Sequence, residues 1–110
     1  MPKRIESPVA RWPGYVMLSD PLTYPQVFAF EDAREAAQNA SKEGIQDWRR
    51  LQYLWLPGIL ACVEEWHLEG IENPTQDTFP ATPAKSASEL LAWLIDEIVM
   101  LHQEAETIPN

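Results

Sequence analysis

The sequence predicts a mainly α-helical domain of three to four helices with a short β-strand or hairpin near the N-terminus. Apolar residues recur at three- and four-residue spacing in three later segments, which indicates amphipathic helices. Only residues 14–18 combine β-forming residue types with turn residues directly after them. The 110 residues allow a single domain. We expect an irregular arm over residues 1–13, the folded domain over 14–106 and a frayed tail over 107–110.

The expected strand is Gly14-Tyr15-Val16-Met17-Leu18, which ends at Ser19-Asp20-Pro21. The arm before it contains Pro2, Pro8 and Pro13, which disfavour regular structure. One strand is not stable by itself, and no second segment matches it. We therefore expect it to pair with the arm or with an edge of another copy, which would make a homo-oligomer.

Two helical segments are expected in the middle of the chain. The first starts at Thr23-Tyr24-Pro25, where a proline costs no helical hydrogen bond, and runs from Gln26 to about Ala40. The second spans residues 46–69. Pro57-Gly58 interrupts it, so we expect a kink or two helices that meet there. Its apolar pattern comprises Trp48, Leu51, Leu54, Trp55, Ile59, Leu60, Val63 and Trp66.

The last helix is expected to start at Ser86-Ala87-Ser88-Glu89, which has the spacing of a capping box. Before it, residues 72–85 are rich in proline and predict an ordered loop that Phe79 pins to the domain. The apolar face of the helix comprises Leu90, Leu91, Leu94, Ile95, Ile98 and Leu101, with Trp93 beside it.

The formal charge of −9 is concentrated in the C-terminal half. Residues 1–61 contain seven basic and seven acidic residues, whereas residues 62–110 contain one basic residue, Lys85, and ten acidic ones. Such a surface repels nucleic acid phosphates and anionic lipid headgroups, so neither nucleic acid nor a membrane is an expected partner. It suits a basic protein partner, or it simply keeps the chain in solution.

We expect the protein in the cytoplasm. No stretch approaches the roughly 20 apolar residues of a membrane span, and no apolar run of signal-peptide length follows the basic N-terminus. The single cysteine, Cys62, cannot form an internal disulfide and fits a reducing compartment.

No residue pattern predicts catalysis, a metal or a cofactor, so we expect a protein that is not an enzyme. Glu64 and His67 have the spacing that puts a carboxylate and an imidazole on one helix face in di-iron bundles, but the second copy of this motif is missing. Cys62 lies in an apolar stretch that hides a thiol. Asp96 and Glu97 fit a solvated helix face better than a paired-carboxylate site.

The aromatic residues favour a protein-binding role. Five tryptophans are many for a domain of this size. Tryptophan is enriched at interface centres because it combines a large apolar area with an N–H donor. The alternative is that the same side chains build the core. The expected partner-binding residues are Trp55, Trp66, Trp93, Leu54, Ile59 and Phe79.

Residues 55–101 also follow a recognisable layout. An apolar helix ends in Trp66-His67-Leu68-Glu69-Gly70, and Asn73-Pro74-Thr75 opens the proline-rich loop. The final helix contains Ser88-Glu89-Leu90-Leu91-Ala92-Trp93-Leu94-Ile95-Asp96-Glu97-Ile98. Upstream, Trp12-Pro13-Gly14-Tyr15-Val16 to Leu22-Thr23 forms an opening strand and turn. This layout resembles the tail assembly chaperones of tailed phages.

The resemblance implies a small, mainly helical protein that coats the long, apolar tape measure protein before the tail tube forms around it. Such chaperones keep the tape measure protein extended and soluble in the host cytoplasm. They also help to bring in the tail tube protein, and they leave before the virion is complete. The kinked apolar helix and the last helix would then form a groove for an amphipathic helix of the tape measure protein.

Three other functions stay open. A small acidic inhibitor could block a nucleic-acid-binding host defence complex, because clustered carboxylates imitate phosphate spacing. A metal-dependent enzyme could use Glu64 and His67. A structural subunit of a larger particle could use residues 14–18 as an assembly edge. Binding to a basic nucleoprotein that weakens with salt would indicate the inhibitor, whereas an apolar contact would tolerate salt.

Overall fold

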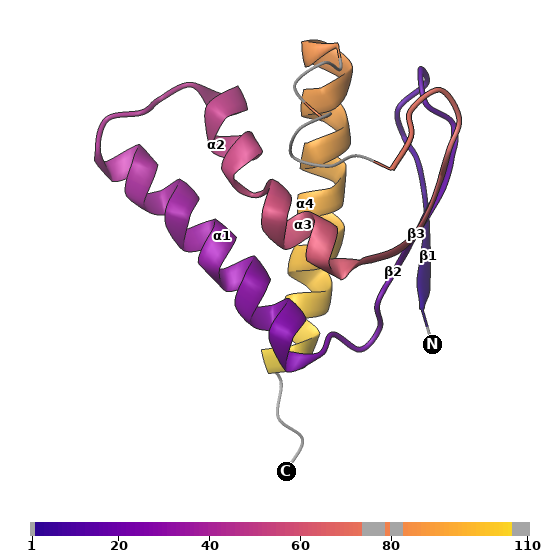
Figure 1. Cartoon of the computed structure of the whole chain (residues 1–110), viewed down its shortest axis with the longest axis horizontal. Coiled ribbons are helices and arrows are strands. Elements are labelled where there is room, and N and C mark those ends of the chain that lie inside the picture. The colour runs from indigo at the N-terminus through magenta and orange to yellow at the C-terminus, as the bar shows by residue number, and fades with distance from the viewer. Residues whose placement is uncertain (1, 74–78, 80–82, 107–110) are drawn as a thin grey trace.

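The protein is a mixed α/β domain, so the expected mainly α-helical fold class is wrong. A computed structural model describes residues 2–73, 79 and 83–106. In order, these residues form β1 (Lys3–Glu6), β2 (Gly14–Leu18), α1 (Tyr24–Lys42), α2 (Trp48–Leu54), α3 (Leu56–Cys62), β3 (Val63–Leu68) and α4 (Ala84–Glu106). The strands form one antiparallel sheet in the order β1-β2-β3. In Figure 1 the sheet lies on one side and α1 on the other, with α2, α3 and α4 between them.

The main difference from the expected fold is β3. We expected a helix over residues 46–69, but α3 ends at Cys62 and the chain continues directly as a strand. Val63 and Trp66 follow Ile59 at helical spacing, so the local apolar pattern is compatible with both structures. The choice between helix and strand therefore depends on contacts that are distant in the sequence.

Pairing with β2 is that distant contact. Val16 and Leu18 of β2 are fully buried, so one face of the sheet belongs to the core. A two-stranded hairpin is marginally stable in water, and β3 supplies the third strand. Trp66 and Leu68 then turn inward, as the alternation of a strand requires.

The expected strand over residues 14–18 is confirmed as β2. One neighbour is β1, in which Ile5 lies opposite Val16, so part of the expected irregular arm is a strand. The other neighbour is β3, and this ladder contains one irregularity. Met17 lies opposite Glu65 and Leu18 opposite Val63, so Glu64 is an extra residue in a bulge.

Two glycines allow close backbone contacts between elements. Gly14 has a φ of +128°, and a Cβ there would overlap the carbonyl oxygen of His67 in β3. Gly58 lies in α3 against α1, where a Cβ would come within 2.8 Å of the Phe30 Cα and 2.9 Å of the Ala33 Cβ. Any larger residue at position 58 would push the two helices apart.

The expected start of the first helix is confirmed. The Thr23 N–H donates to the Gln26 Oε1 (2.9 Å) and the Gln26 N–H donates to the Thr23 Oγ1 (3.4 Å), which is a capping box. The Gln26 Nε2 also donates to the Ser19 Oγ and to the Ala61 carbonyl oxygen, at 2.7 Å and 3.1 Å. These bonds tie the start of α1 to the end of α3.

The interruption at Pro57 is also confirmed, as two short helices. α2 ends at Leu54 and α3 begins at Leu56, with Trp55 between them. Phe79, the residue expected to pin the proline-rich loop, is buried in the core. The rest of that loop around Pro74 and Pro80, and the expected tail over residues 107–110, lie outside the described residues.

The expected capping box at residues 86–89 is wrong, because α4 already begins at Ala84. Ser88 instead binds Gln52 of α2, which is only 1% exposed. The Gln52 Nε2 donates to the Ser88 carbonyl oxygen (3.1 Å), and the Ser88 hydroxyl donates to the Gln52 Oε1 (2.8 Å). A buried amide must be hydrogen-bonded, and Ser88 satisfies both of its ends.

The apolar face of α4 fills the centre of the molecule, as its spacing predicts. Leu90, Leu94 and Ile98 are fully buried, and they belong to one core cluster with residues of the inner face of the sheet and of α3. Within the part of the chain that the structure describes, no helix is both long and apolar enough to span a bilayer.

We expect Ser88→Ala to lower the free energy of unfolding by about 1–3 kcal/mol, because it leaves the buried Gln52 Oε1 without its donor. Urea unfolding followed by circular dichroism measures this. Ser86→Ala is the matched control, and it should change stability by less than about 0.5 kcal/mol. Equal losses in the two variants would contradict the assigned role of Ser88.

Candidate functional site

The six residues expected at a partner-binding surface do not form one surface. Ile59 and Phe79 are 0% and 4% exposed and belong to the core. Trp55, Trp66 and Trp93 are half-buried and pack against the core. Leu54 is half-buried and lines a surface hollow. Among these six residues, Leu54 lines a hollow on the helical side of the molecule.

Two of the three half-buried tryptophans have clear structural contacts. The Trp55 ring packs on Phe30 of α1, with ring centroids 5.3 Å apart. The Trp66 Nε1 donates to the Ile71 carbonyl oxygen at 3.0 Å and holds the segment after β3 against the sheet. Their large areas thus stabilise the fold, as in the alternative in which tryptophans build the core.

The most exposed tryptophan among the described residues was not in the expected set. Trp48, the first residue of α2, is 62% exposed, and Tyr53 of the same helix is 37% exposed. The apolar pattern of residues 46–69 suggested that Trp48 is part of a buried stripe. That pattern assumes one continuous helix, whereas α2 has only seven residues and turns Gln52 toward the core. Trp48 lies one turn before Gln52 on the same helix face, but as the first residue of α2 it borders the hollow beside the start of α4 and stays exposed.

These side chains border two hollows on either side of α2. One, of about 340 Å³, is lined by Ile45, Arg50, Tyr53 and Leu54. The other, of about 700 Å³, lies between the start of α2 and the start of α4 and is lined by Asp47, Trp48, Lys85, Ser88 and Glu89. We call Ile45, Trp48, Tyr53 and Leu54 the α2 surface.

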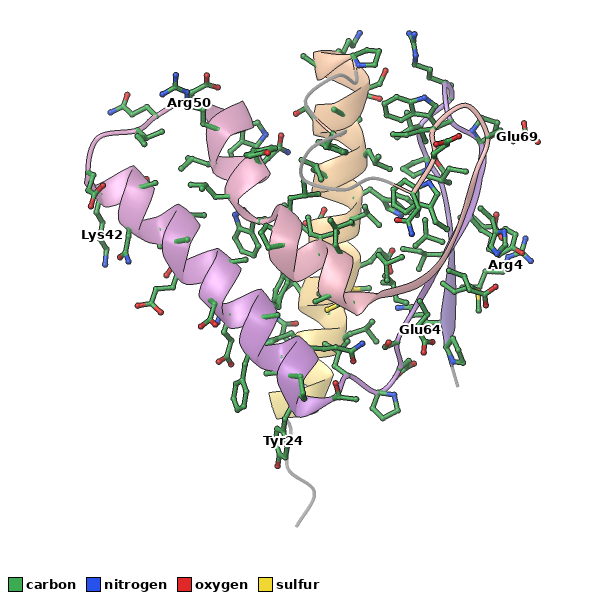
Figure 2. All side chains as sticks on the ribbon, viewed as in Figure 1. Arg4, Tyr24, Lys42, Arg50, Glu64 and Glu69 are labelled. Carbon is green, nitrogen blue, oxygen red and sulfur yellow. The ribbon has the colours of Figure 1, made fainter. Side chains whose placement is uncertain are left out.

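The hollow lined by Tyr53 and Leu54 is mainly apolar, with Arg50 as the one charged side chain among its described lining residues, whereas the hollow beside Trp48 is also lined by charged residues. Arg50 and Lys85 are exposed beside Asp47 and Glu89, so both signs of charge are present. Figure 2 shows Arg50 near the start of α2, far from Tyr24 at the start of α1. Apolar and charged side chains also lie next to each other in protein interfaces, where polar residues surround an apolar core.

Other exposed apolar side chains lie elsewhere. Tyr24 and Phe28 are 79% and 57% exposed and stack on each other near the start of α1, with ring centroids 6.0 Å apart. Met100 is exposed on α4. None of these three side chains lines either of the two hollows beside α2. Phe28 is therefore a suitable comparison position for the α2 surface.

The expected Glu-x-x-His pair does not share a helix face, because both residues lie in β3. Glu64 is the bulge residue, while His67 stacks on Tyr15 at 4.7 Å and its Nε2 lies 3.0 Å from the Glu65 Oε1. His102 is buried on α4, and its Nε2 lies 3.1 Å from the Glu31 Oε1. Residues 2–73, 79 and 83–106 contain no group of three or more His, Cys, Asp or Glu side chains that could hold a metal ion.

Cys62 ends α3 inside the core and is 0% exposed. Burial raises the pKa of its thiol from 9.0 to about 11, because the thiolate loses its hydration. The neutral thiol therefore predominates across the physiological pH range, and Cys62 behaves as a small apolar core residue.

We expect Cys62 in the native protein to react with iodoacetamide at least about 100-fold more slowly than in the urea-unfolded chain at neutral pH, since the thiolate fraction falls tenfold per pKa unit. Mass spectrometry of the alkylated protein over time measures the two rates. Similar rates in the folded and unfolded chains would contradict the burial of this thiol.

Comparisons of the chain with models of protein families, with curated proteins and with solved structures gave no match. The likeness to tail assembly chaperones is therefore a proposal that depends on the residues and surfaces of this chain.

Proposed function

We propose that this chain is a protein-binding protein, a tail assembly chaperone that holds an amphipathic helix of the tape measure protein on the α2 surface. The observation that carries the proposal is the exposure of two aromatic side chains of α2. Tyr53 lines an apolar hollow with Leu54 and Ile45, and Trp48 lines the hollow toward α4. Large aromatic side chains outside the core stabilise an assembly only when a partner covers them.

The geometry suits a helix better than an extended chain. An amphipathic helix presents apolar anchors at three- and four-residue spacing, and these anchors enter separate depressions on the receptor. The hollows on the two sides of α2 provide such depressions. Arg50, Lys85, Asp47 and Glu89 around them would contact the polar sides of the bound helix.

The corrected fold changes one part of the resemblance and supports another. The segment ending in Trp66-His67-Leu68 is a strand, so it contributes no helix to a groove. The hollow beside Trp48 lies between α2 and α4, which belong to the same two helical segments that the resemblance pairs as a groove. This hollow is therefore at the N-terminal ends of these helices.

Co-expression with the tape measure protein of the same genome, followed by size exclusion, tests the proposal. We expect the tape measure protein to be soluble and to co-elute with many copies of this chain. Trp48→Ala combined with Tyr53→Ala should weaken the complex at least about tenfold, because interface aromatics often contribute 2 kcal/mol or more each. The complex should persist in high salt, since its contact is apolar.

Phe28→Ala is the control, because it removes an aromatic ring about as exposed as that of Trp48 from a different surface. It should leave the complex intact. Loss of binding in this variant, with binding retained in the double variant, would place the site on α1. An insoluble tape measure protein and a chain that elutes alone would refute the chaperone function. Salt-sensitive capture of a basic nucleoprotein would then favour the inhibitor.

A further inference from the structure

The edge of β3 that pairs with no strand among the described residues is a second candidate interaction surface. We propose that it binds an extended, basic segment of a partner protein, which adds to the sheet as a fourth strand. We call the unpaired side of Val63–Leu68 the β3 edge. This surface goes beyond the proposed function, because it does not include the α2 surface and requires a different partner chemistry.

Two hydrogen bonds show which backbone groups face each side of β2. The Ser7 N–H donates to the Gly14 carbonyl oxygen (2.9 Å), so Gly14 directs its backbone groups toward the β1 side. The Glu69 N–H donates to the Pro13 carbonyl oxygen (2.8 Å), so Pro13 faces the β3 side. In an antiparallel ladder, successive residues alternate between the two sides. Tyr15 therefore faces β3, as Pro13 does.

The same alternation identifies the free groups of β3. His67 lies opposite Tyr15 and uses its backbone N–H and carbonyl inside the sheet. Trp66 and Leu68, on either side of it, direct their backbone groups away from β2. β3 is the last strand of the sheet, so within the described residues no strand covers these groups. Such an edge is a template for a further strand.

A hollow accompanies this edge. It has a volume of about 520 Å³ and is lined by Trp66, Leu68 and residues 70–73. The hydrogen bond from the Trp66 Nε1 to the Ile71 carbonyl oxygen holds its two walls together. In strand addition, backbone bonds provide affinity and pockets beside the strand select side chains. The hollow is placed to receive one side chain of the added strand.

The charge of the edge specifies the partner. Glu64, Glu65, Glu69 and Glu72 are all exposed, and residues 63–73 contain no Lys or Arg. Figure 2 shows Glu64 and Glu69 at the two ends of β3. Opposite charges across neighbouring strands stabilise pairing and like charges destabilise it. A segment with Lys or Arg at alternate positions therefore fits this edge.

A second copy of this chain fits less well. Its own basic strand, β1, has both charges already in ion pairs, since the Lys3 Nζ lies 3.4 Å from the Glu97 Oε2 and the Arg4 Nε lies 2.6 Å from the Glu6 Oε1. Pairing β3 with β3 of another copy would bring glutamates together. The occupant is therefore a different protein.

Amide exchange of the full-length, ¹⁵N-labelled protein tests this inference with a peptide of about twelve residues that alternates Lys with Val. We expect the amides of Trp66 and Leu68 to exchange at least about tenfold more slowly when the peptide is bound. The amides of Glu65 and His67 should change little, because they are already bonded within the sheet. A peptide with Glu in place of Lys is the control and should not bind.

Glu64→Lys combined with Glu69→Lys should weaken peptide binding at least about tenfold, since it replaces attraction with repulsion at the two ends of the edge. The matched control is Glu89→Lys combined with Asp96→Lys, which reverses two exposed charges on α4 and should not affect the peptide. Trp48→Ala combined with Tyr53→Ala should also bind the peptide normally. A result that refutes peptide binding at the β3 edge can thus be distinguished from a result that refutes the chaperone function.

Three outcomes would overturn the inference. The amides of Trp66 and Leu68 could stay unprotected at saturating peptide, or the acidic peptide could bind as well as the basic one. Alternatively, the same amides could become protected as the concentration of the protein alone is raised, which would make a second copy the occupant.

Discussion

The antiparallel pairing of β2 with β3 is the constraint on which the rest of the structure depends. β3 begins at Val63, directly after α3 ends at Cys62, and no loop separates them. The Ser19 N–H donates to the Cys62 carbonyl oxygen at 3.0 Å, so the ladder starts at the helix end itself. Once β3 is paired, α3 cannot move relative to the sheet. The contact of Gly58 with α1 then positions the first helix as well.

Features set by neighbouring residues could be predicted from the sequence. Thr23 and Gln26 identify the start of α1, because a capping box requires only a three-residue spacing. Pro57 identifies the break between α2 and α3 through its missing N–H. β3 could not be predicted in this way, since Val63 and Trp66 suit a helix and a strand equally. Its conformation depends on β2, about 50 residues away, and a single sequence does not reveal that pairing.

The same limit applies to the candidate site. Ser88 looks like a helix cap until Gln52, 36 residues earlier, is known to be buried beside it. Gln52 directs the orientation of α2, because its amide must reach Ser88. That orientation leaves Tyr53, the next residue along the helix, toward solvent. A polar residue in the core thus exposes one aromatic side chain of α2, and a search for apolar stripes overlooks it.

The α2 surface and the β3 edge use different physical interactions on different layers of one packed core. The first offers aromatic area, whose burial is nearly independent of salt, whereas the second offers carboxylates and unpaired backbone groups, whose attraction for a basic strand is screened within about 8 Å at physiological salt. Sites that share no side chains usually contribute additively. One partner that carried a helix followed by a basic extended segment would gain affinity only if its linker spanned the distance between the two layers. Otherwise the two surfaces serve separate partners, and the exposed glutamates of residues 63–73 select only the partner of the β3 edge.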